Sequence, residues 1–91
     1  MAVTIRIPTQ LRQLSGGASE VSVEGASVSE ALKALDAAHP GFSERLYDES
    51  GGLRRFVNVF VADEDIRFLD GVDTVLTDGQ TVSIVPAVAG G

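Results

Sequence analysis

Apolar and polar residues alternate in two short segments near the start of the chain. Residues 3–7 (VTIRI) have a period of two, which is typical of a strand with one buried face, and Pro8 ends this segment or confines it to a sheet edge. Residues 20–24 (EVSVE) repeat the alternation. Between the two segments, residues 15–19 (SGGAS) have the composition of a turn. We therefore predict a β-hairpin.

The pattern changes to helical spacing at residue 27. Ser27 and Glu30 form the S-x-x-E pattern of a capping box, in which Ser27 accepts from an early backbone N–H and Glu30 reaches back to the cap. Residues 39–41 (HPG) end the pattern, because a proline disfavours helical backbone at the preceding residue. We predict one amphipathic helix, followed by a short helical turn within residues 42–48. The apolar face of the helix consists of Val28, Ala31, Leu32, Leu35 and Ala38.

Three segments of the second half have the composition of strands. Residues 56–61 (FVNVFV) are rich in β-branched and aromatic side chains, and after a polar turn at residues 63–65 we expect a short strand at 66–68. The Asp78-Gly79 turn signal precedes a last strand at 81–85.

The order of two strands, one helix and three strands predicts the α+β class. Its best-known solution is the β-grasp (ubiquitin-like) fold, a mixed sheet with the helix on one face. We predict four to five strands packed on one main helix, in one domain over residues 1–85. Residues 86–91 then form an extended, flexible Gly-Gly tail.

The phase of the strand at 56–61 predicts an apolar patch on the uncovered face of the sheet. If the three valines of this strand face the helix, Phe56 and Phe60 lie on the other face. Val85 joins them because it is out of phase with the apolar residues before it, and Pro86 adjoins it. Aromatic anchors are enriched in interface cores, so these four residues are candidates for partner binding. The alternative is the opposite phase, with Phe56 and Phe60 in the core.

The chain is acidic, and its charge is unevenly distributed. Seven Lys and Arg residues stand against 13 Asp and Glu residues, a formal net charge of −6. Such a chain repels polyanions, which argues against nucleic acid as a partner. Residues 63–91 hold Arg67 alone against six acidic residues. This segment is either a plain solubilising surface or one that steers this end of the molecule towards a basic partner.

Few residues of the chain are suited to catalysis. The absence of Cys and the single His, His39, exclude thiolate metal sites and cysteine nucleophiles and argue against a Ser-His-Asp triad. We find neither a signal peptide nor a run of about 18 apolar residues. We therefore expect a cytoplasmic protein that binds no metal, cofactor or membrane and is not itself an enzyme.

The last six residues, 86–91 (PAVAGG), have no charge except the terminal carboxylate. Pairing should end at Pro86, which has no N–H for a ladder hydrogen bond. Gly90 and Gly91 add nothing to packing, but with Val88 and Ala89 they allow the backbone to pass through a narrow channel. The Gly91 carboxylate is ionised at neutral pH and can attack the α-phosphate of ATP. A persulfide or sulfide can convert the resulting acyl adenylate into a thiocarboxylate, so we predict that Gly91 is the reactive residue.

Segments spread over almost the whole chain carry a resemblance to a known family. They are residues 3–9 (VTIRIPT), 43–46 (SERL), 55–59 (RFVNV), 63–68 (DEDIRF) and 86–91 (PAVAGG). With them the chain resembles the ubiquitin-like sulfur-carrier family of ThiS, MoaD and CysO, most closely its CysO branch. The C-terminal motif is common to the family, whereas the internal segments are more specific.

The resemblance implies which partners act on Gly91. An activating enzyme of the MoeB/ThiF type uses ATP to adenylate the Gly91 carboxylate, which is then converted into the thiocarboxylate. In the CysO branch the sulfur passes to a pyridoxal-phosphate-bound aminoacrylate on a cysteine synthase. A metalloprotease releases the cysteinyl adduct or exposes the Gly-Gly end. Related carriers supply secondary metabolites through a sulfur-insertion enzyme, so the acceptor stays open.

Three other functions remain as alternatives. The chain could be the small subunit of molybdopterin synthase, but tails of the MoaD type carry two consecutive prolines, and Ala87 occupies the second position here. It could be a ubiquitin-like modifier that is joined to lysines by isopeptide bonds. It could also be a plain interaction domain, whose tail would be dispensable.

Overall fold

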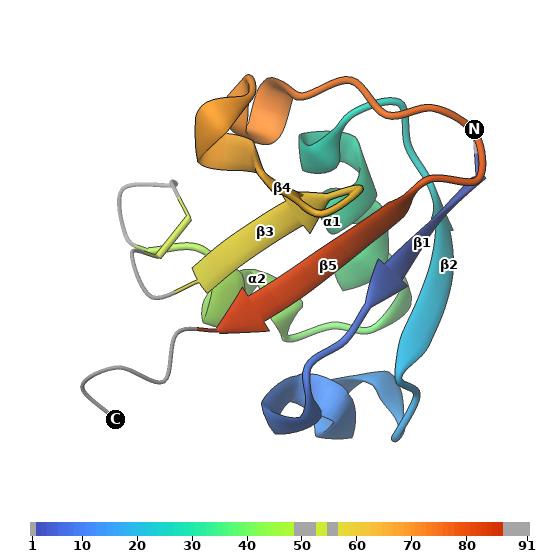
Figure 1. Cartoon of the computed structure of the whole chain (residues 1–91). Helices are drawn as coiled ribbons and strands as arrows, with labels where there is room; N and C mark the ends of the chain where they lie inside the picture. The colour runs from blue at the N-terminus through green and yellow to red at the C-terminus, as the bar shows by residue number, and fades with distance from the viewer. Residues whose placement is uncertain (1, 49–52, 55–56, 87–91) are drawn as a thin grey trace.

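The computed structural model describes residues 2–48, 53–54 and 57–86 (Figure 1). Its elements are the strands β1 (Ala2–Arg6), β2 (Glu20–Glu24), β3 (Val57–Val61), β4 (Glu64–Asp65) and β5 (Thr81–Pro86), the helices α1 (Val28–Ala38) and α2 (Phe42–Leu46), and the 3-10 helices η1 (Thr9–Ser15), η2 (Ile66–Phe68) and η3 (Gly71–Asp73).

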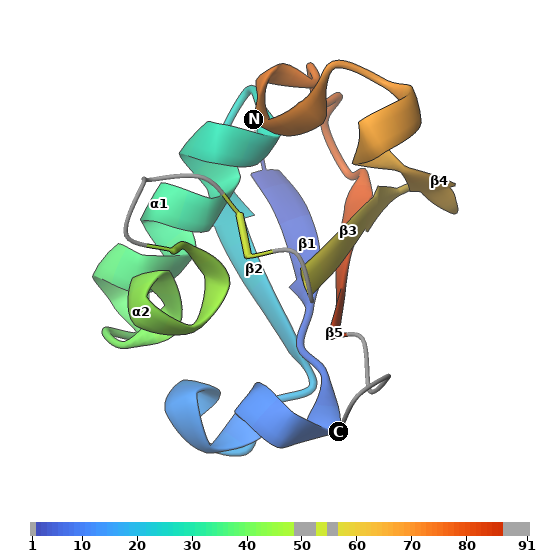
Figure 2. The same cartoon turned by 90° about the vertical axis from the view of Figure 1, so that its left-hand side faces the viewer.

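The described strands form one mixed sheet in the order β2-β1-β5-β3-β4. β1 and β5 are parallel, and the other neighbouring strands are antiparallel. Figure 2 shows α1 and α2 together on one side of the sheet. The predicted β-grasp fold, a mixed sheet packed on one main helix, is confirmed.

The strand phase decides which residues lie between the sheet and the helices. The three valines of β3 are buried, as are Val82 and Ile84 of β5. Phe60 is half-buried and Val85 is 43% exposed, so both lie on the uncovered face. Phe60 is therefore not a core residue, whereas Phe56 lies outside the described residues. The other core side chains with almost no exposure include Val3, Ile5, Ile7, Val28, Leu32, Leu35, Phe42, Leu46 and Leu76.

The N-terminal cap of α1 differs from the expected one in one hydrogen bond. The Ser27 side chain accepts from the Glu30 backbone N–H at 3.2 Å, as a capping box requires. The Glu30 carboxylate, however, accepts from the Ala26 N–H at 3.1 Å instead of returning to Ser27. The helix ends before Pro40, where the His39 N–H donates to the Leu35 carbonyl.

The structure of the segment after β3 differs from the predicted turn and strand. The turn lies at Ala62 and Asp63, whose φ angles are +51° and +72°, and Glu64–Asp65 is already strand β4. Residues 66–68 form the 3-10 helix η2 and not a strand, since the Asp65 side chain accepts from the Arg67 N–H at 2.9 Å and caps the turn. Ile66 is therefore buried, and Phe68 is 85% exposed.

Asp36 of α1 fixes the start of α2. Its Oδ1 accepts from the backbone N–H groups of Gly41 at 3.2 Å and Ser43 at 3.0 Å. These hydrogen bonds, the one from Ser43 foremost, lower the pKa of Asp36 below its ordinary value of 3.8. The carboxylate thus acts as a helix cap supplied from a neighbouring helix.

We expect Asp36→Ala to lower the free energy of unfolding by about 1 kcal/mol at neutral pH, as the loss of a cap does. Because folding lowers this pKa, the stabilisation is complete above pH 3.8 and is lost as the pH falls through the pKa of the folded state. Urea unfolding from pH 7 to pH 3 measures both effects. Equal losses for the variant and the wild type on acidification would contradict this role of Asp36.

Candidate functional site

The base of the C-terminal tail is the end of the central strand of the sheet. β5 lies between β1, which pairs with residues 81–83, and β3, which pairs with it as far as Pro86 opposite Val57. β5 is thus bonded on both sides over residues 81–83 and on the β3 side as far as Pro86, and it directs the chain out of one end of the sheet. Residues 87–91, with the predicted reactive Gly91 and the access residues Val88, Ala89 and Gly90, lie outside the described residues.

Two apolar side chains of the predicted patch lie on the uncovered face of β3 and β5, and one of them, Val85, adjoins this base. The β3–β5 register pairs Phe60 with Ser83 and Asn58 with Val85. Phe60 and Val85 are therefore diagonal neighbours on the uncovered face, about 7–8 Å apart between Cα atoms. The structure brings these two predicted residues together, whereas the docking of a partner on them remains a prediction. Phe56 and the side chain of Pro86 lie outside the described part.

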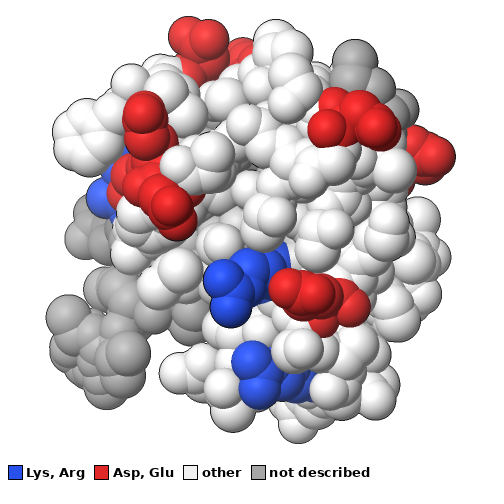
Figure 3. Space-filling view, turned by 45° about the vertical axis from the view of Figure 1, so that its right-hand side comes forward, with Lys and Arg blue, Asp and Glu red and all other residues white. Residues whose placement is uncertain are grey.

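A groove of about 530 Å³ lies at the same end of the sheet. It is bordered by the end of β1 with η1 on one side and by the end of β5 on the other. Basic side chains gather on the lower part of this face, with acidic ones beside and above them (Figure 3). The groove is lined by Arg6, Ile7, Pro8, Thr9, Gln10, Arg12, Ser19, Glu20, Ser83, Ile84 and Val85.

The two arginines of the groove are held differently. The Nε of Arg12 donates to the Ile7 carbonyl at 3.2 Å. Arg6 pairs across the strands with Glu20 at 4.0 Å, and both side chains are largely exposed, so this ion pair is weak. No acidic side chain of the described residues forms an ion pair with Arg12.

The described residues provide little catalytic chemistry. Among them, no group of three or more His, Cys, Asp or Glu side chains could hold a metal ion. The clearly shifted pKa values belong to Asp36 and to Tyr47, whose pKa is raised by burial, and both residues lie on or after the helices that cover the other face. No helix in the described part is long and apolar enough to cross a membrane.

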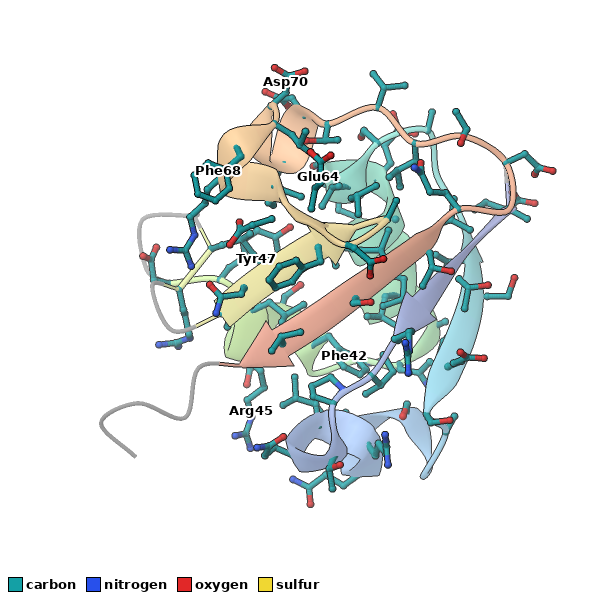
Figure 4. The ribbon with its side chains drawn as sticks, in the orientation of Figure 1. Phe42, Arg45, Tyr47, Glu64, Phe68 and Asp70 are labelled. Atoms are coloured by element: carbon teal, nitrogen blue, oxygen red, sulfur yellow. The ribbon has the colours of Figure 1, made fainter. Side chains whose placement is uncertain are left out.

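Sequence reasoning missed three exposed or half-exposed side chains. Arg6 and Arg12 lie far from β5 along the chain, and they reach it only through the parallel pairing of β1 with β5. Phe68 was expected in a strand, and instead it projects from η2 away from the sheet (Figure 4). The alternation of residues 3–7 could have placed Arg6 on the uncovered face, but no local signal marks Arg12.

Comparison with known proteins assigns the family. The ThiS family model matches residues 5–91, and the chain belongs to the ThiS family. Over 93 aligned residues, with 100% of both chains covered, it is 50% identical to the sulfur carrier protein CysO of Mycobacterium tuberculosis. The chain is thus a homologue of CysO, which supports a role as a sulfur carrier, and the predicted resemblance is confirmed.

Solved structures of the same family have the same fold. A chain of the Amycolatopsis orientalis BexX/CysO complex matches with a TM-score of 0.90 and 46% identity, covering 98% of this chain and 99% of that one. The crystal structure of Mycobacterium tuberculosis CysO matches with a TM-score of 0.89 and 48% identity, covering 94% and 99%. The first of these structures contains a CysO together with a second protein, BexX.

Proposed function

We propose that the chain is a sulfur carrier that works through a thiocarboxylate on Gly91. A carboxylate oxygen of Gly91 attacks the α-phosphorus of ATP on an activating enzyme of the MoeB/ThiF type, and pyrophosphate leaves. Sulfide then attacks the acyl carbon of the adenylate, AMP leaves, and the terminal carboxylate has exchanged one oxygen for sulfur. The chain contributes the reacting terminus, and the partner contributes the ATP site and the catalysis.

The observation that carries this proposal is the match to CysO over the whole chain, including its end. The family match extends through residue 91, so the Gly-Gly terminus is part of the similarity. The pairing of β5 with β3 as far as Pro86 supports it, since a base held in the sheet lets a short tail present its carboxylate to a buried reaction centre.

We propose cysteine, or another sulfur-containing metabolite, as the product. The partner would be a cysteine synthase that holds pyridoxal phosphate, with a metalloprotease to release the product, or a sulfur-insertion enzyme of secondary metabolism. The BexX/CysO complex supports a protein partner for carriers of this type. On this proposal the chain binds no cofactor of its own and acts in the cytoplasm, where its partners use ATP.

Intact-mass measurement tests the proposal. The chain is incubated with ATP, sulfide and the activating enzyme of its own organism, and we expect the mass increase of one oxygen-for-sulfur exchange. Omission of ATP is the control and should leave the mass unchanged. An unchanged mass with all components present would overturn the thiocarboxylate proposal. Isopeptide adducts on lysines of other proteins, in place of the exchange, would show a protein modifier.

We expect Phe60→Ala to weaken binding of the activating enzyme about tenfold, because a half-buried aromatic beside Val85 on the uncovered face is suited to be an interface anchor. Calorimetric titration measures the affinity, and a thermal melt verifies the fold. Phe68→Ala is the matched control, since this ring projects from η2 and is 85% exposed. Loss of the fold in Phe60→Ala, or equal losses of affinity in the two variants, would refute the prediction that the patch binds the activating enzyme.

A further inference from the structure

The groove beside β5 has a positive net charge, although the molecule as a whole is acidic. Its charged lining residues are Arg6, Arg12 and Glu20, which together carry a net charge of +1, whereas the whole chain carries −6. The wall opposite the arginines includes Val85, the residue before the last residue of β5. A ligand in this groove would therefore lie next to the point where the tail begins.

Arg12 is prepared for an anion before any ligand arrives. Its Nε is occupied by the Ile7 carbonyl, which fixes the direction of the guanidinium and leaves its two terminal NH₂ groups for another acceptor. The backbone of η1 is fixed as well, because the Arg12 carbonyl accepts from the Gly17 N–H at 2.7 Å. A planar guanidinium held in this way suits the two oxygens of a carboxylate.

The neighbours of Arg12 favour a carboxylate over a phosphate. Glu20 lies 4.0 Å from Arg6 and offsets one of the two positive charges, so a single negative charge balances the groove. A phosphate with two negative charges would meet the Glu20 carboxylate with an uncompensated charge. Thr9 and Gln10 add a hydroxyl and an amide to the lining, and Pro8 and Val85 add apolar surface.

The position of the groove points to the protein that supplies this carboxylate. The five residues beyond Pro86 reach at most roughly 18 Å when fully extended. A protein that takes Gly91 into a reaction centre must therefore approach the end of β5 and cover its surroundings. We propose that the groove binds an Asp or Glu side chain of the activating enzyme, with Arg12 as the main contact and Arg6 as the second. This inference rests on the proposed function, and it adds a recognition site to it.

Binding of the full-length chain to the activating enzyme, without nucleotide, tests the groove. We expect Arg12→Gln to weaken the affinity about tenfold and to make it less dependent on salt, because a charge-assisted hydrogen bond is lost. Arg12→Lys should recover part of the loss, and Arg6→Gln should show a smaller one. Lys33→Gln, which removes one exposed positive charge from α1 on the other side of the sheet, should bind as the wild type does.

The outcomes distinguish failure of the groove proposal from failure of the proposed function. Equal affinities for Arg12→Gln and Lys33→Gln would overturn the proposal, and so would a loss that appears only with ATP bound, since the groove would then hold a phosphate. If Arg12→Gln melts at a lower temperature than the wild type, the affinities of Arg12→Lys and Arg6→Gln are compared with that of the wild type instead. Wild-type chain that never acquires sulfur would refute the proposed function instead. Normal acquisition of sulfur by the wild type, together with equal affinities of Arg12→Gln and Lys33→Gln, would refute the groove proposal alone.

Discussion

Deletion of Gly91 is expected to abolish the oxygen-for-sulfur exchange while the chain still binds its activating enzyme. The deletion moves the terminal carboxylate back by one residue, about 3.3–3.6 Å along an extended chain. Reacting atoms must approach to about 3–3.5 Å, and a misplacement of about 1 Å can reduce the rate about 100-fold. The residues proposed for docking precede residue 87 and are unchanged, so the affinity should change little.

Two measurements separate the two chemical steps in this variant. Exchange of labelled pyrophosphate into ATP reports adenylation, and intact mass reports the transfer of sulfur. A chain extended by one C-terminal glycine is the matched control, because it keeps Gly91 but moves the carboxylate by the same distance in the other direction. It should fail in the same way. If the chain without Gly91 acquires sulfur at the wild-type rate, Gly91 is not the residue that the reaction requires.

The faces of the strands could be predicted from the sequence because they depend on local alternation. The period of two in residues 57–61 places the valines in the core and Phe60 on the uncovered face, as the structure has them. The Ser27 cap could also be predicted, because the capping residue and its N–H partner are three residues apart. The fold class followed from the order of these elements.

The bounds of the turn after β3 could not be predicted from local signals, although a polar turn was expected at residues 63–65. Ala62 and Asp63 both have positive φ, which glycine or asparagine would normally indicate, so no local signal marks the start of the turn at Ala62. The end of the turn was therefore placed too late, and η2 was taken for a strand. The exposure of Phe68, which lies in η2, was therefore not predicted.

The groove depends on contacts between distant parts of the chain. Arg12 and Val85 line the same groove because β1 and β5 pair in parallel, with Ile5 opposite Val82. Such pairing is a property of the whole sheet and leaves no periodic mark near Arg12. Sequence reasoning could therefore place Phe60 and Val85 on the uncovered face, but it could not predict the basic groove beside Val85.

Gly25→Ala is expected to lower the free energy of unfolding by about 3 kcal/mol, because the first turns of α1 pack directly over the backbone at Gly25. A Cβ there would lie 2.7 Å from the Ala31 nitrogen and 2.9 Å from its Cα. Both are backbone atoms of the helix, so no side chain can rotate away. The connection between β2 and α1 would have to shift, and with it the packing of Val28 and Leu32 on the sheet.

Gly16→Ala separates this steric effect from the general cost of replacing a glycine. Gly16 ends η1 with φ of +68°, and a Cβ there would meet nothing within 4 Å. Gly16→Ala should therefore lower the free energy of unfolding by about 1 kcal/mol, because alanine disfavours a positive φ. Urea unfolding gives both values from the midpoints if the m-values agree. A Gly25→Ala loss no larger than that of Gly16→Ala would mean that α1 can move away from β2. The helix would then not be fixed against the sheet as this close approach implies.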